Sequence, residues 1–279
     1  MTILYLILRI LSNPFANAFQ KKIVQKDSAI LSNFYVYLLL ATGCLIPFCK
    51  EVTGITPEVY GYASFAGILC TMGTICLIKA LERGELSVLG PINSYKCIIG
   101  LISAYIFLGE VPGWWGIIGM VLIIYGSRFI FETTKEGFSL ELLKRRDIQL
   151  RFAALFFSGV EAGILKKVIS LSSPEISFYL WCIFGAVFTF IVLIMSKERI
   201  KRPENIRDYI VVGVSLAIMQ LSTNKVFAGM DVGLALALFQ LSTLVTLLLG
   251  YKMFKEREIK KKLVGSLIMI IGSAIILIQ

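Results

Sequence analysis

The chain has 279 residues, of which 57% are hydrophobic and 16% are charged, and its formal net charge is +10. A soluble globular domain carries more charge and less apolar side chain than this. The positive charge could indicate a nucleic-acid partner, but the Lys and Arg residues fall in short connections between apolar runs, where the positive-inside rule explains them. We therefore expect a membrane protein whose partner is the lipid bilayer, with no nucleic-acid partner.

The residue types that usually carry catalysis or bind metals are scarce. Histidine, the commonest general base and metal ligand, is missing from the sequence. No cysteines are paired at the spacing of a zinc site, so small apolar filler is the simpler interpretation of the six: Cys44, Cys49, Cys70, Cys76, Cys97 and Cys182. The sequence therefore predicts no cofactor, no metal and no catalytic residue. Because Arg9 interrupts the first apolar run, residues 1–20 are expected to be a retained helix and not a cleaved signal peptide.

Apolar stretches of about 20 residues, long enough to cross a bilayer as helices, recur along the whole chain. In chain order, hydropathy and helix breakers predict ten transmembrane helices over residues 2–20, 31–49, 60–80, 87–108, 113–131, 150–169, 176–196, 209–229, 233–251 and 261–279. The polar segment 132–148 is the longest connection and a natural midpoint linker.

The two halves of the chain resemble each other. A shift of 146 residues aligns Lys79 with Lys225, Glu110 with Glu256, and Gly119 with Gly265, without a gap. The sequence therefore predicts two five-helix units, residues 1–131 and 149–279, joined by the linker 132–148. An odd number of helices in each unit makes the second enter the membrane from the opposite side. The predicted fold class is an all-α membrane protein with ten transmembrane helices, arranged as two inverted five-helix repeats around a central cavity.

Lys and Arg residues are concentrated in the odd-numbered connections, and the even-numbered ones carry only Lys50, Lys166, Lys167 and Lys225. The positive-inside rule then places the odd connections, including the linker, in the cytoplasm and both termini outside.

The segment from Lys79 to Phe131 contains "FLGEVPGWWGIIGMVLIIYGSRFI", a Leu-Gly-Glu turn followed by a helix with spaced glycines. This pattern is similar to the EamA family of the drug/metabolite transporter superfamily. The second copy, "MFKEREIKKKLVGSLIMIIGSAIIL", keeps the Glu and the glycines but has Phe254-Lys255 in place of Leu-Gly. The resemblance implies ten helices in two repeats over the whole chain, and a secondary transporter of a small metabolite with a cavity between the halves. Its substrate is not implied, because substrates in the family are diverse.

Three charges fall near the middle of predicted helices: Arg9, Lys96 and Glu161. Charges at this depth are costly and usually mark a functional site. Arg9, Asn13 and Asn17 share one helical face, as do Asn93 and Lys96 on the fourth helix. With polar residues of the eighth and ninth helices, the substrate-binding candidates are Arg9, Asn13, Asn17, Asn93, Lys96, Glu161, Gln220, Asn224, Gln240 and Thr243. Glu161 is also the candidate for proton coupling, because small multidrug relatives in the superfamily carry a Glu on their first helix.

A structural interpretation of these charges remains open, in which Arg9 or Lys96 pairs with Glu161 to hold the halves together. For Glu110 and Glu256, beside predicted turns, capping of a helix N-terminus is favoured. Repeated glycines such as Gly119 and Gly265 are expected to permit close helix contact. Trp181 is expected to belong to an interfacial aromatic belt.

The sequence predicts a secondary transporter of a small polar metabolite that bears a carboxylate or phosphate, such as an amino acid or organic acid. Its partners are a small-molecule substrate and the bilayer, it is expected to be a monomer, and a bacterial inner membrane is its expected location. The alternatives are a membrane-embedded lipid-modifying enzyme, for which the sequence offers no catalytic constellation, and a lipid scramblase or regulator.

Overall fold

The computed structural model describes residues 2–51, 55–99, 113–139 and 141–277, and within these every regular element is a helix. In chain order the elements are α1 (Thr2–Val24), α2 (Ala29–Glu51), α3 (Pro57–Arg83), α4 (Leu86–Leu89), η1 (Pro91–Ser94), α6 (Trp114–Phe131), η2 (Leu142–Lys144), α7 (Arg146–Leu171), α8 (Pro174–Met195), α9 (Ile206–Gly229), α10 (Val232–Phe239), α11 (Ser242–Phe254) and α12 (Ile259–Ile276). Residues 95–99 are also helical.

The predicted fourth and ninth helices are not continuous, which corrects the sequence-based bounds. The fourth, expected over 87–108, is interrupted at Gly90 and η1, where Pro91 cannot donate a backbone hydrogen bond. The ninth, expected over 233–251, breaks between α10 and α11 at Gln240 and Leu241, although no proline is present there. The part of the fourth helix after residue 99 lies outside the described residues, as do the Leu-Gly-Glu turn and Glu110.

Helix bounds repeat along the chain with nearly the offset seen in the sequence. α3 ends at Arg83 and α9 at Gly229, and the next helices begin at Leu86 and Val232, each 146 residues apart. α6 and α12 begin at Trp114 and Ile259, 145 residues apart. A backbone contact repeats as well: Lys21 Nζ donates to the Gly84 carbonyl, and Lys166 Nζ donates to the Met230 carbonyl. These agreements support the proposed units 1–131 and 149–279.

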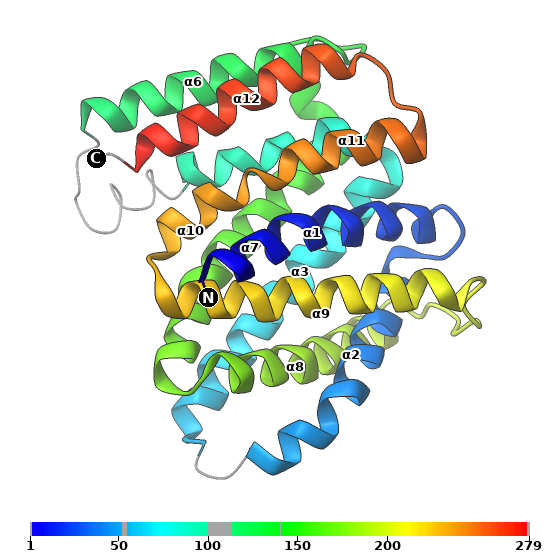
Figure 1. The fold of residues 1–279 in the computed structure, drawn as a ribbon. Helices are drawn as coiled ribbons and strands as arrows, with labels where there is room; N and C mark the ends of the chain where they lie inside the picture. The colour runs from blue at the N-terminus through cyan, green and yellow to red at the C-terminus, as the bar shows by residue number, and fades with distance from the viewer. Residues whose placement is uncertain (1, 52–54, 100–112, 140, 278–279) are drawn as a thin grey trace.

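The two halves interleave. α1 packs on α9, and α3 packs on α7, so the first helix of each unit contacts the third helix of the other. α6 and α12 lie side by side at the top of Figure 1, and α2 packs against α8 at the bottom. The start of α1 and the end of α12 lie at the same edge of the view.

Glycines set the close approach of α6 and α12. A Cβ added at Gly126 would lie 2.7 Å from the Gly265 carbonyl oxygen, and one added at Gly119 would lie 2.6 Å from the Gly272 carbonyl oxygen. A Cβ added at Gly265 or Gly272 of α12 would come equally close to the backbone of α6. The expectation that these glycines permit close helix contact is confirmed.

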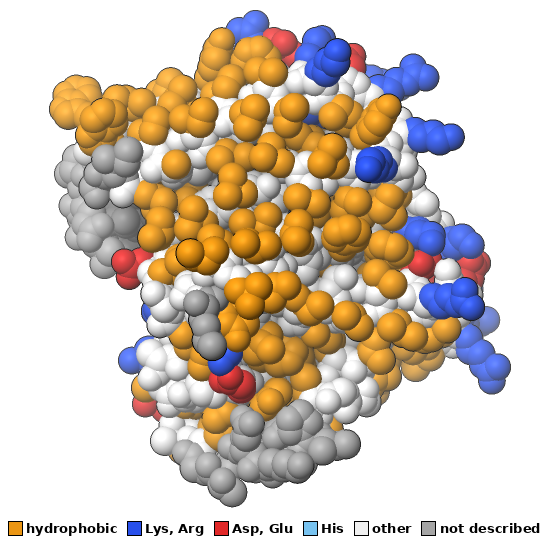
Figure 2. Space-filling view, viewed as in Figure 1, with side chains coloured by type: hydrophobic (Ala, Val, Ile, Leu, Met, Phe, Trp, Pro, Cys, Tyr) orange, Lys and Arg blue, Asp and Glu red, His pale blue; other side chains and the backbone are white. Residues whose placement is uncertain are grey.

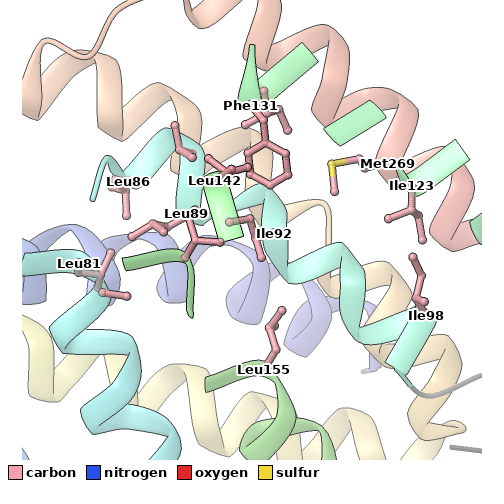
Figure 3. Close-up of a cluster of buried hydrophobic side chains, with 14 of the residues drawn as sticks. Leu81, Leu86, Leu89, Ile92, Ile98, Ile123, Phe131, Leu142, Leu155 and Met269 are labelled. Carbon is pink, nitrogen blue, oxygen red and sulfur yellow. The ribbon is translucent and has the colours of Figure 1, made fainter. Parts of the chain in front are cut away.

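An apolar core anchors the broken fourth helix. Leu86, Leu89 and Ile92 are each 1% exposed and pack with Leu81 of α3 and Leu155 of α7. Figure 3 shows this cluster extending to residues of α6 and α12. Helix α4, of only four residues, is too short to be stable alone, so these tertiary contacts hold it in place.

The exterior suits a lipid environment. Among the described residues, six helical spans are long and apolar enough to cross a membrane, one of them being Val232–Phe254 across the α10–α11 break, and a shorter apolar helix covers Ala29–Leu45. Figure 2 shows hydrophobic side chains across the middle of the visible face, whereas most of the visible Lys and Arg lie along the edge that holds the α1–α2 and α11–α12 connections. The chain is an integral, multi-pass membrane protein; that it has ten spans remains our proposal.

Candidate functional site: a charged central cavity

A cavity of about 160 Å³ lies between the two halves. Its lining comes from α1, α3, the segment 91–99, α7, α9 and α10, with Tyr37 of α2 and Trp181 of α8 added. Of the candidates from the sequence, it gathers Arg9, Asn13, Asn17, Asn93, Lys96, Glu161 and Gln220. Candidates from the first half of the chain thereby meet candidates from the second half, because α1 packs on α9 and α3 packs on α7.

Arg9 enters the cavity from α1. Its Nε donates to Thr223 Oγ1 of α9 at 2.9 Å, and its guanidinium carbon lies 4.6 Å from the centre of the Phe239 ring. Its Nη1 is buried and has no hydrogen-bond partner in the described structure. A buried donor without a partner is costly unless a ligand or water completes it. Arg9 therefore offers a free N–H group to an anion.

Lys96 and Glu161 face the same cavity without pairing. Within the described residues, neither Lys96 nor Arg9 forms an ion pair with Glu161. The interpretation that these charges pair to hold the halves together is therefore wrong for this conformation. Glu161 instead accepts a hydrogen bond from Trp181 Nε1 at 3.0 Å. Both charges remain available to a ligand.

Arg151 is a third cation of the cavity. Sequence reasoning missed it, because it was counted with the Lys and Arg residues of the odd-numbered connections. It lies on the second turn of α7, is 7% exposed, and donates from Nε to the Leu89 carbonyl at 2.8 Å. Its Nη2 donates to Asn93 Oδ1 at 3.1 Å. The guanidinium thereby satisfies a carbonyl at the end of α4, where a cation is favourable.

The two helix breaks meet at an amide pair. Asn93 Nδ2 donates to Gln240 Oε1 at 3.2 Å, and Gln240 Nε2 donates to the Asn93 carbonyl at 3.4 Å. Gln240 Nε2 also donates to the Leu236 carbonyl at 3.1 Å, a group that the break of the α10–α11 helix leaves without its usual partner. Gln240 is fully buried and does not line the cavity, so its position indicates support of the break.

Asn224 and Thr243 also lie outside the lining. Asn224 is fully buried, donates to the Pro174 carbonyl at 3.0 Å, and accepts from Gln220 Nε2 at 3.0 Å. It therefore positions Gln220 and the start of α8. Thr243 is 3% exposed in the first turn of α11.

Trp181 lies at the cavity and not in an interfacial belt, which corrects the sequence-based expectation. Its side chain is 4% exposed and its ring lies 5.0 Å from that of Tyr37, centre to centre. Tyr37 Oη lies 2.9 Å from Cys70 Sγ. Tyr37 and Cys70 were not among the candidates, because an aromatic and a thiol on apolar helices carry no signal of a polar site.

Ion pairs also join the two halves beside the start of α4. Lys21 of α1 pairs with Glu256 at 2.8 Å, and buried Lys262 of α12 pairs with Glu85. Glu256 also accepts from the backbone amides of Leu86 and Ser87 at 2.7 and 2.8 Å. The capping role predicted for Glu256 is thus confirmed, but the helix that it caps is α4 and not the following α12.

Electrostatically, the described lining holds three cations and one carboxylate in a site largely removed from water. This arrangement can hold an anionic group by charge-assisted hydrogen bonds. Among the described residues, no group of three or more His, Cys, Asp or Glu side chains could hold a metal ion.

Comparison with known proteins follows the same division of the chain. The model of the EamA-like transporter family matches residues 1–132 and again residues 147–278. Two curated relatives, the S-adenosylmethionine uptake transporters of Rickettsia prowazekii and Rickettsia felis, are 29% and 28% identical over 140 residues. Each match covers 49% of this chain and 47% of the relative, so the match spans about half the length of either protein.

One solved crystal structure of a protein superposes with a TM-score of 0.65 and covers 96% of this chain and 95% of its own. At 10% identity this likeness concerns the fold alone. The two family matches together cover nearly the whole chain, and the chain belongs to the EamA-like transporter family.

Proposed function

We propose that the protein is a secondary transporter that carries a small polar metabolite with a carboxylate or phosphate group across the membrane by alternating access. The observation that carries the proposal is the cavity between the halves, in which buried Arg9 Nη1 has no partner and Lys96 makes no ion pair in the described structure. Family membership favours transport over a membrane-embedded enzyme or a scramblase.

The two broken helices support alternating access. Half-helices that meet near the membrane midplane are a recurring feature of transporters built from inverted repeats. Here the breaks are joined by Asn93 and Gln240, one from each half. Movement of one half against the other would reshape the cavity around this contact, and the ion pairs of Lys21 and Lys262 would close one end. We further propose that the protein works as a monomer and that it lies in a bacterial inner membrane.

Glu161 is the proposed site of proton coupling. It is the only acidic residue among the described lining of the cavity. A carboxyl at this depth can take up and release a proton as the cavity changes its access to water. The named solute of the Rickettsia relatives, S-adenosylmethionine, belongs among the candidates to be tested.

The proposal is tested by solute flux into proteoliposomes, using amino acids, organic acids, sugar phosphates and S-adenosylmethionine, with and without a proton gradient. For the solute that is carried, we expect Lys96→Met and Arg9→Met to lower uptake about tenfold or more. A hydrogen bond to a charged group contributes about 1.5–3 kcal/mol, and about 1.4 kcal/mol corresponds to a factor of ten.

Lys252→Met, which removes an exposed lysine at the end of α11, is the matched control and should keep wild-type uptake. Gel filtration establishes that each variant remains folded. Wild-type uptake by both cavity variants would contradict the assignment of the site, and absence of flux for every solute class would contradict transport.

A further inference from the structure

The described lining of the cavity carries charges of both signs, and we call Arg9 and Lys96 its positive pole and Glu161 its negative pole. Arg9 and Lys96 supply positive charge, and Glu161 supplies the negative charge of the described lining. Opposite charges attract strongly in a site of low dielectric, yet Glu161 forms no ion pair with either cation in the described structure. Each pole therefore lacks an ion-pair partner among the described residues, and a ligand with both charges would supply one to each.

The negative pole is surrounded by groups that suit a cationic ligand. Trp181 Nε1 donates to one oxygen of Glu161, which fixes the carboxylate. The rings of Trp181 and Tyr37 line the same cavity and are inclined at 57° to each other. Aromatic faces attract ammonium and other onium groups, and this attraction is stronger where water is excluded. Trp181 and Tyr37 are 4% and 0% exposed, so this wall is removed from solvent.

The positive pole is suited to one carboxylate. Arg9 offers its free Nη1, and Lys96 lines the cavity without an ion pair to any described residue. Arg151 is already bound to the Leu89 carbonyl and to Asn93, so it supports the helix break while adding positive potential.

Resting on the transport function proposed above, we propose that the solute is a zwitterion, which places its carboxylate between Arg9 and Lys96 and its ammonium or sulfonium group against Glu161, Trp181 and Tyr37. Glu161 then acts as the residue that selects for the cationic group. This role concerns the loaded cavity, whereas the proton-coupling role concerns the empty one.

The test uses the full-length protein in detergent with Trp114→Phe and Trp115→Phe, which leaves Trp181 as the only tryptophan. Its fluorescence reports binding of the proteinogenic amino acids and S-methylmethionine, of succinate and glycerol 3-phosphate as dianions, and of two analogues of the tightest zwitterion. One analogue lacks the amino group, and the other has an amide in place of the carboxylate. We expect both analogues to bind at least tenfold more weakly than the zwitterion.

Further substitutions in the protein with Trp181 as its only tryptophan test whether Glu161 selects for the cationic group. Glu161→Gln should abolish the preference for the zwitterion over the analogue without an amino group, Glu161→Asp should retain it, and Lys96→Met should weaken binding of both. Glu258→Gln, which makes the same change at an exposed carboxylate outside the cavity, is the matched control and should preserve the preference.

Tightest binding of a dianion, an unchanged preference in Glu161→Gln, or absence of binding by every zwitterion would overturn this inference. Flux of a dianion that depends on Lys96 would overturn it too, but would leave the proposed transport function intact. Absence of any flux would instead refute transport.

Discussion

At the scale of single residues, Lys255 holds a backbone conformation that glycine adopts more easily. It ends α11 at φ 53° and ψ 34°, in the left-handed region. Its amide donates to the Tyr251 carbonyl at 3.0 Å, and the next amide, of Glu256, donates to the Gly250 carbonyl at 3.2 Å. This is the arrangement in which glycine usually closes a helix. The aligned position of the first half is Gly109, within its Leu-Gly-Glu sequence.

We expect Lys255→Gly to stabilise the protein. The left-handed conformation costs a residue with a Cβ about 1–2 kcal/mol, which the substitution removes. Glycine is more flexible in the unfolded chain, and this offsets about 0.5–1 kcal/mol of the stabilisation, so the net gain is about 0.5–1 kcal/mol. Thermal denaturation of the purified protein in detergent measures the change. Lys252→Gly, within α11, should instead destabilise by about 1 kcal/mol. Equal destabilisation by both substitutions would refute the argument.

Arg151 shows which residues of the site the sequence could not reveal. Hydropathy identified Arg9, Lys96 and Glu161, because each is a charge within an apolar run. Arg151 lies near the start of α7 and follows closely on the cations of the linker, so its sequence position does not distinguish it from them. Its role depends on the Leu89 carbonyl, which is exposed only because the fourth helix breaks in the other half of the chain. No local pattern contains that information.

At the scale of elements, Glu256 joins the connection before α12 to two elements of the first half. It pairs with Lys21 of α1 and caps α4 through the amides of Leu86 and Ser87. Burial favours the neutral carboxyl and raises its pKa, but the charge and hydrogen bond of Lys21 and the contacts with Ser87 outweigh burial, so the pKa of Glu256 lies below the usual 4.5. The ionised carboxylate therefore stabilises the arrangement.

We expect Glu256→Gln to destabilise the protein by about 3 kcal/mol near neutral pH, because it leaves the buried Lys21 ammonium without its counter-charge. The sign of the pH dependence follows from the lowered pKa. Stability from the ionised form is fully present above pH 4.5 and is lost as the pH falls through the pKa of the folded protein. The difference between wild type and variant, measured by denaturation across this range, should therefore shrink in acid.

The control for this prediction is Glu258→Gln, which changes an exposed carboxylate two residues away and should have little effect at any pH. A difference for Glu256→Gln that stays constant into acid would show that the ion pair does not stabilise the fold.

The helix breaks show how far elements can be predicted. The first break follows from Pro91, which removes a backbone donor, although one continuous helix was expected over 87–108. The second break, at Gln240, has no proline or glycine and lies in the apolar run "LALALFQLS", which reads as a continuous helix. It is stabilised by the contacts of Gln240 with Asn93 and with the Leu236 carbonyl, so the packing of the two halves overrides local helix propensity.

At the scale of the whole molecule, the halves are joined along several independent contacts. α6 and α12 meet through glycines, α1 and α9 through Arg9 and Thr223, and the helix breaks through Asn93 and Gln240. The offset found in the sequence recurs in the helix bounds, in agreement with the proposed division. Repetition alone does not indicate which side of the membrane each connection faces; the Lys and Arg content of the connections does.

We expect the edge rich in Lys and Arg to face the cytoplasm and both ends of the chain to lie outside. The cations in view gather at the α1–α2 and α11–α12 connections, whereas the start of α1 and the end of α12 lie at the opposite edge. Cationic connections resist translocation, so this asymmetry sets the orientation. A periplasmic reporter fused to the C-terminus should be active and a cytoplasmic reporter inactive there.

The same pair of reporters inserted at Gly137 of the linker should give the reverse result. Gly137 has φ 62° and open space around it, so the insertion does not disturb a packed helix. The two positions control for each other, because a reporter that failed to fold would be inactive at both. A cytoplasmic reporter that is active at the C-terminus and inactive at Gly137 would show that the orientation is the opposite of the one expected here. The ion pairs of Lys21 and Lys262 would then lie at the outer end of the cavity instead of the inner one.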